Sequence, residues 1–83
     1  MVEFRDIEVY FLDLSETHQG RQVTPGWNKI SEVEVLETNC EFRLEVMRGP
    51  GGRQWLALYN DACNGGTAKV VVKGHKEVEE EMR

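Results

Sequence analysis

Apolar and polar residues alternate with period two along several stretches of this chain. In residues 4–14, Ile7, Val9 and Phe11 alternate with Glu8 and Tyr10, which is the pattern of a half-buried strand. A helix over the same residues would leave Val9 outside its apolar face. The pattern therefore predicts a strand in residues 4–14.

Residues 15–29 are polar and predict a long connection, with a short strand near residues 21–24. The Pro25-Gly26 pair is typical of a turn, because proline presets one φ angle and glycine accepts a positive one. Trp27 follows this turn. We expect its ring to fold back as a lid on the core, although an exposed Trp27 would be a binding anchor.

Residues 30–48 fit two different structures. Ser31 and Glu34 would form a capping box at the start of one long helix. That helix would place Val35, Phe42 and Val46 on its polar side. The stretches EVEV and EFRLEV also alternate at period two. We therefore favour two strands over one helix.

Residues 41–73 predict a three-stranded antiparallel meander. Residues 42–48 pair with residues 53–59 across the tip Gly-Pro-Gly-Gly if Val46 lies opposite Trp55 and Leu44 opposite Ala57. Asn64-Gly65 suits a two-residue hairpin turn. That turn would bring residues 66–73 beside residues 55–59, with Trp55 lying across from Gly74.

These elements predict a mainly β fold. We expect all 83 residues to form one domain built on a single antiparallel sheet of about five strands. Residues 75–83 carry the sequence HKEVEEEMR and are expected to form an acidic tail or a short C-terminal helix.

One face of the predicted meander needs a cover. Leu56, Leu58 and Val71 would point away from the first core, and an uncovered face of this kind would be an exposed apolar patch. Residues 4–14 or the C-terminal residues would supply the cover. Otherwise a partner chain would, and a symmetric dimer is the commonest such solution.

Charge and hydropathy exclude several partners. The formal net charge is −5, and the Lys and Arg residues are scattered rather than clustered. Direct nucleic acid binding is therefore disfavoured. No apolar run approaches the ~18 residues of a membrane span, and the charged N-terminus does not resemble a signal peptide. We expect no membrane association and a cytoplasmic location.

The soft and titratable side chains show no catalytic or metal-binding spacing. Cys40, Cys63, His18 and His75 form no C-x-x-C or H-x-x-x-H pair. A nucleophile–base pair of Cys63 and His75, oriented by Asp61, matches no known signature. Cys40 and Cys63 would sit diagonally in the meander, slightly far for a disulfide, so two partly buried thiols are favoured. We expect no metal, no cofactor and no enzymatic activity.

Two charged features suggest other binding functions. Arg48 and Arg53 would face each other beside the glycine-rich tip, residues 49–52, and could hold an anion. A row of carboxylates would project from the strands and could imitate nucleic acid phosphates. Its members are Glu32, Glu34, Glu41 and Glu45.

The sequence thus favours a small non-enzymatic interaction module that binds a protein partner or itself through the half-apolar face. The alternatives are an acidic inhibitor of a basic nucleic-acid-binding surface and a domain for a small anionic ligand. The candidate binding residues are Trp27, Arg48, Arg53, Leu56, Leu58 and Val71.

Overall fold

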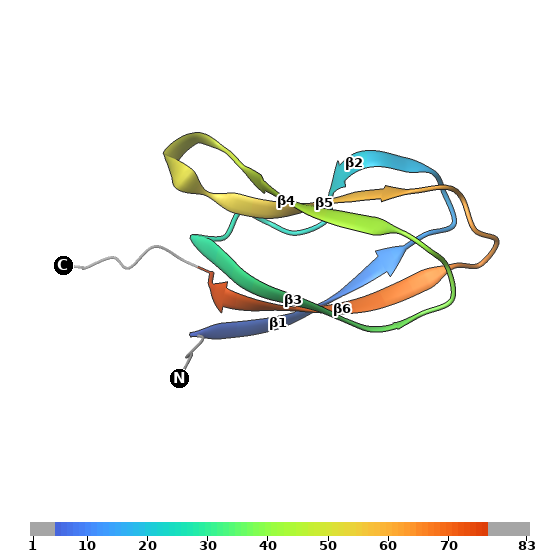
Figure 1. The fold of residues 1–83 in the computed structure, drawn as a ribbon, viewed down its shortest axis with the longest axis horizontal. Helices are drawn as coiled ribbons and strands as arrows, with labels where there is room; N and C mark the ends of the chain where they lie inside the picture. Colours follow the sequence, from blue (N-terminus) through green and yellow to red (C-terminus); the bar gives the residue numbers. More distant parts are fainter. Residues whose placement is uncertain (1–4, 77–83) are drawn as a thin grey trace.

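The protein is a sandwich of two antiparallel sheets, seen edge-on in Figure 1. The computed structural model describes residues 5–76 and shows, within them, no helix besides one 3-10 turn, Pro50–Gly52. The six strands are β1 Asp6–Asp13, β2 His18–Gln22, β3 Lys29–Thr38, β4 Arg43–Arg48, β5 Gln54–Asn60 and β6 Thr67–His75. The mainly β prediction is confirmed. The C-terminal tail or helix lies outside the described residues, apart from His75 and Lys76.

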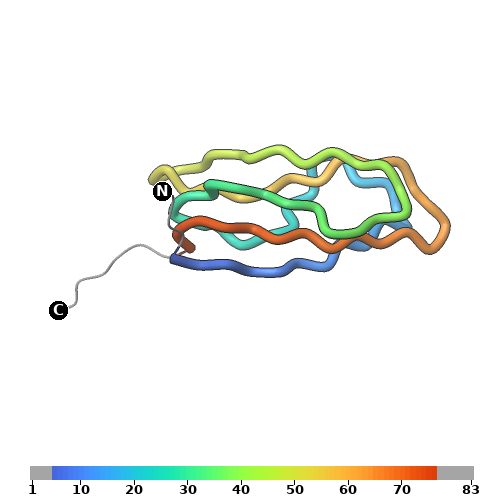
Figure 2. Tube along the Cα trace, turned by 60° about the horizontal axis from the view of Figure 1, so that its bottom comes forward, coloured from blue at the N-terminus to red at the C-terminus, as the bar shows by residue number. Residues whose placement is uncertain are grey.

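The strands divide between two sheets rather than one. The first sheet has the order β1-β6-β3 and the second the order β2-β5-β4. Figure 2 shows β6 running between β1 and β3. We call the β1-β6-β3 sheet sheet A and the β2-β5-β4 sheet sheet B. Each is three-stranded, so the prediction of one five-stranded sheet is wrong.

The predicted pairing of β5 with β6 is also wrong, because these strands lie in different sheets. Residues 61–66 cross from one layer to the other, and the Gly66 N–H donates to the Cys63 carbonyl at 2.8 Å. The physical reason is burial. Leu56 and Leu58 on β5 face Val70 and Val72 on β6 across the core, so the apolar side chains of both strands are buried from solvent.

The β4–β5 hairpin exists, but its register differs by one residue from the predicted one. Val46 lies opposite Leu56 and Met47 opposite Trp55. The turn is longer than four residues, since the Gly49 N–H donates to the Arg53 carbonyl around the 3-10 turn. A one-residue slip reverses the faces. Leu56 and Leu58 therefore point into the core, while Trp55 is only half-buried.

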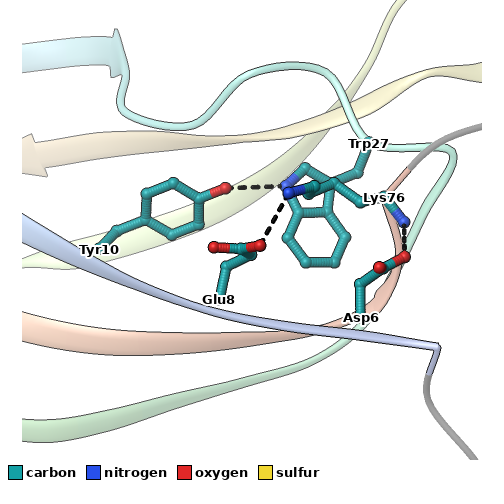
Figure 3. A network of polar contacts seen from close by, with 5 residues as sticks. All are labelled: Asp6, Glu8, Tyr10, Trp27 and Lys76. Atoms are coloured by element: carbon teal, nitrogen blue, oxygen red, sulfur yellow. Dashed lines mark hydrogen bonds and ion pairs between the residues drawn. The ribbon is translucent and has the colours of Figure 1, made fainter.

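The core closes around Trp27, which is 0% exposed. Its backbone exchanges two hydrogen bonds with Gln54, and its Nε1–H donates to the Tyr10 hydroxyl at 3.1 Å (Figure 3). The Gln54 side chain accepts the Ile30 N–H at 2.7 Å and so links β5 to β3. The expected lid over the core is confirmed. Trp27 is not an exposed anchor.

Two glycines allow close approach of neighbouring groups. The Trp55 ring packs against Gly49, and a larger residue would not fit there, because an added Cβ would lie 2.5 Å from Trp55 Cζ3. Gly74 lies against the backbone of Lys29, where β3 and β6 meet. The sequence placed Trp55 over Gly74, but β5 and β6 lie in different sheets, and Gly49 takes that position instead.

A disulfide joins Cys40 and Cys63, which corrects the prediction of two free thiols. The two residues lie in the β3–β4 and β5–β6 connections, at the same end of the sandwich (Figure 1). Their Cα atoms are 6.3 Å apart, within the usual range for a disulfide. The prediction placed both cysteines in one sheet, whereas each connection crosses between sheets.

Candidate functional site

The described residues contain no metal-binding cluster. Within residues 5–76, no group of three or more His, Cys, Asp or Glu side chains could hold a metal ion. Cys63 is disulfide-bonded, so it has no thiolate to attack a substrate. The Cys63–His75 pair considered from the sequence therefore has no nucleophile.

Arg48 and Arg53 do not form the facing pair expected beside the glycine-rich tip. Arg48 lies opposite Gln54 and is exposed. Arg53 follows the turn, and its Nη2 donates to the Gly26 carbonyl at 2.7 Å. The Arg53 guanidinium thus links the turn at Gly26 to the β4–β5 turn, whereas the Arg48 side chain is exposed to solvent. The register removes the geometric basis of an anion site at this tip.

The carboxylates of β3 lie beside lysines rather than forming an unneutralised row. On the outer face of sheet A, Lys73 Nζ lies 3.7 Å from carboxylate oxygens of both Glu32 and Glu34. Lys69 Nζ lies 4.0 Å from Glu37. Such exposed pairs add little stability. They do lower the local negative charge, which weakens the case for a nucleic acid mimic on this face.

The opening of the sandwich between β1 and β2 is polar. Asp13 accepts hydrogen bonds from the Ser15 hydroxyl at 2.6 Å and from the Ser15 N–H at 2.9 Å. His18 Nε2 lies 3.0 Å from the Asp13 carbonyl oxygen. The hydroxyl first, and then the N–H, lower the pKa of the Asp13 carboxyl below its ordinary value.

We predict that the Asp13 pKa rises toward its ordinary value in Ser15→Ala, as measured by NMR titration of the carboxyl carbon. Because the folded pKa is lowered, this carboxylate stabilises the fold above its unfolded pKa. The contribution is lost as pH falls through the folded pKa. Equal Asp13 titration curves in the two proteins would contradict the assignment.

The outer face of sheet A carries a row of exposed apolar side chains on β1. Ile7, Val9 and Phe11 are 59%, 45% and 75% exposed. We call this row the β1 stripe. The Lys69 ammonium lies 5.7 Å from the centre of the Phe11 ring, and Val71 lies opposite Val9. Of the three apolar residues predicted to share one face, only Val71 lies on an outer face; Leu56 and Leu58 are buried between the sheets.

A second apolar surface lies where the sandwich opens between β3 and β4. There a groove of about 640 Å³ runs between the two sheets, and we call it the β3–β4 groove. Val35 and Val46, on its two sides, are 45% and 48% exposed. Cys40 of the disulfide lies in its wall. The full lining is Val33, Val35, Thr38, Cys40, Glu41, Phe42, Leu44, Val46 and Leu56.

Neither apolar surface is among the binding surfaces expected from the sequence. A signal for the β1 stripe exists, because residues 9–12 are apolar on both faces of the strand. That pattern is typical of a strand covered on both sides. The groove has no local signal, because its two walls come from strands whose facing depends on the sheet topology.

Neither a membrane-spanning helix, in the part of the chain that the structure describes, nor a similar known protein is found. Within residues 5–76, no helix has the length and apolar character needed to cross a bilayer. Comparison of the chain with protein-family models, with curated proteins and with solved structures gives no significant match.

Proposed function

We propose that this chain is a non-enzymatic protein-binding module that holds an extended segment of a partner protein in the β3–β4 groove. The observation that carries the proposal is an open apolar groove of about 640 Å³ bordered by two strand edges. A mostly apolar concavity of this size with few polar groups is the usual form of a binding site.

The backbone at the border of the groove supports an extended occupant. β3 and β4 are each the last strand of their sheet, so one side of each strand has no neighbouring strand among those described. Such an edge can accept the main-chain hydrogen bonds of an added strand, and pockets beside it select alternate side chains. An extended peptide uses both features, whereas a compact ligand uses only the apolar wall.

The partner segment fits β4 better than β3. The register of β3 is broken at two places, between Ile30 and Glu32 and between Val35 and Glu37. These irregularities bend the edge away from regular pairing. β4 pairs with β5 without a break over all six residues, from Arg43 to Arg48. A strand added to β4 would direct every second side chain toward Leu44, Val46 and the groove.

This geometry predicts the chemistry of the segment. Its inward residues are apolar, since Val35 and Val46 lose water when they are covered. Its outward residues are polar, because they lie level with the ion pair of Arg43 and Glu45 on the outer face of β4. We therefore expect a short segment that alternates apolar and polar residues.

The test is a selection of displayed random peptides on immobilised protein. We expect enriched peptides to alternate apolar and polar residues and to lose affinity at least tenfold with Val46→Lys. Val9→Lys is the matched control, because it adds the same charge to an equally exposed valine outside the groove. Amide NMR shifts on peptide addition should concentrate in β4. A failure to enrich any peptide, or equal binding to Val46→Lys, would refute the proposal.

A further inference from the structure

We propose that two copies of this chain associate by antiparallel pairing of their β1 edges, with Val9 at the two-fold axis. The two A sheets then form one continuous sheet. This interaction goes beyond the proposed peptide site, because β1 and β3 are the opposite edge strands of sheet A (Figure 2) and the groove is bordered by β3, not by β1. Three features of β1 support this pairing: its regular edge, its outward side chains and its self-complementary register.

β1 has the longest regular edge among the four edge strands described. It pairs with β6 over eight residues without a register shift. β2 has five residues and a shift between Gln19 and Arg21, and β3 has two shifts. β4 is regular but has six residues. Short length and bulges are two of the means by which natural edges avoid pairing with another copy of the same chain, and β1 has neither.

The outward side chains of β1 also lack the usual charged protection. Ile7, Val9 and Phe11 are all apolar and exposed. On β3 the corresponding outward positions carry Glu32, Glu34 and Glu37. On β4 two of the three carry a charge, Arg43 and Glu45, and the third is Met47. Edge strands in soluble proteins commonly place a charge at such positions, which opposes pairing between copies of the same chain. An apolar row on a regular edge is instead typical of a strand that pairs with a partner.

The edge is held in place for pairing by a polar network at its start (Figure 3). The Lys76 N–H donates to Asp6 Oδ2 at 2.7 Å, and the Lys76 ammonium contacts Glu8 at 2.7 Å. Tyr10 bonds the buried Trp27 ring. Three successive inward residues of β1 are thus tied to the body of the domain. A fixed edge loses less conformational entropy when a second strand pairs with it.

A two-fold axis at Val9 gives a self-complementary register. Ile7 then lies opposite Phe11 of the second copy, and Val9 lies opposite Val9. Aromatic and β-branched cross-strand pairs stabilise antiparallel sheets. On the inner face Glu8 lies opposite Tyr10, so no carboxylate meets another.

The neighbouring registers are worse matched. Moving the axis to Glu8 places two glutamates directly opposite each other, which is repulsive. Moving it to Tyr10 places Ile7 opposite Asp13 of the second copy. The register at Val9 is therefore the one that pairs the whole β1 stripe. Because the apolar positions Ile7 and Phe11 are symmetric about Val9, a second copy of the chain presents the matching strand in a two-fold contact.

The test is a charge exchange at the two-fold axis, followed by sedimentation velocity from micromolar to millimolar concentration. We expect the wild-type protein to shift from monomer to dimer as concentration rises. Val9→Lys and Val9→Glu alone should remain monomeric, because like charges meet at the axis. Their equimolar mixture should recover the dimer. Val46→Lys, the matched control in β4, should dimerise as the wild type does.

A second pair of variants fixes the antiparallel register. Ile7→Lys with Phe11→Glu places opposite charges face to face in the dimer, whereas Ile7→Lys with Phe11→Lys places like charges there. We expect the first double variant to dimerise and the second to stay monomeric. A monomeric wild type at millimolar concentration, or a mixture of Val9 variants that stays monomeric, overturns the proposal. Circular dichroism confirms that each variant is folded, and peptide binding in the groove is unaffected by either outcome.

Discussion

Trp27→Ala is expected to lower the free energy of unfolding by about 3–5 kcal/mol, the range for deleting a large buried aromatic side chain. The ring is 0% exposed and packs with Ile30, Leu56 and Val72, which come from both sheets. Its loss leaves a cavity between the layers. It also leaves the Tyr10 hydroxyl without the Nε1–H donor. Small domains are stable by only about 5–15 kcal/mol, so this change removes a large share.

Urea unfolding followed by far-UV circular dichroism measures the effect without relying on tryptophan fluorescence. Trp27→Phe keeps most of the ring volume and loses the hydrogen bond, so it should cost less than Trp27→Ala. Trp55→Ala is the matched control, because Trp55 is only half-buried on the outer side of sheet B and should cost less as well. A midpoint for Trp27→Ala equal to that of Trp55→Ala would show that Trp27 does not hold the layers together.

The local periodicity of the sequence was enough to predict most of the strands. Alternation in residues 4–14 identified β1, and the EVEV and EFRLEV stretches identified β3 and β4. The polar connection with Pro25-Gly26 also suggested that Trp27 would return to the core. These features depend on neighbouring residues along the chain, which is why a pattern in one sequence reveals them.

The assignment of strands to sheets depends on contacts between distant residues. Asn64-Gly65 satisfies the local rule for a hairpin, yet the chain crosses to the other layer there. The apolar side chains of Leu56 and Val72 are compatible both with adjacent positions in one sheet and with packing face to face between two sheets. Only the packing of the whole domain distinguishes these arrangements, since sandwich layers bury more apolar surface than one open sheet.

The same limit explains the errors at the candidate site. The register of β4 and β5 depended on one turn residue, and that single step moved Leu56 and Leu58 from an outer face to the core. The exposure of Phe11 follows from its position on the outer face of sheet A, which depends on the sheet topology rather than on local sequence. The disulfide depends on two loops meeting at one end of the sandwich.

Loss of the Cys40–Cys63 disulfide is the second change with a large expected effect, about 3 kcal/mol of unfolding free energy. The bond spans a sequence separation of 23 residues. A cross-link of this span restricts the unfolded chain and thereby stabilises the fold by roughly the stated amount. It closes a loop containing all of β4 and β5, so the β4–β5 hairpin gains most from it. The chain has this stability only where the compartment keeps the bond oxidised.

The measurement compares urea unfolding of the oxidised protein, the protein reduced with a phosphine, and the Cys40→Ala/Cys63→Ala double variant. We expect both altered forms to unfold at lower urea concentration and with a steeper slope, because their unfolded chains expose more surface. The reductant should leave the midpoint of the double variant unchanged, which separates bond loss from other effects. If reduction leaves the wild-type midpoint unchanged, then the bond does not stabilise the sandwich. In that case the two crossing loops meet through packing alone, around Gly66, where an added Cβ would lie 2.5 Å from Cys40 Sγ.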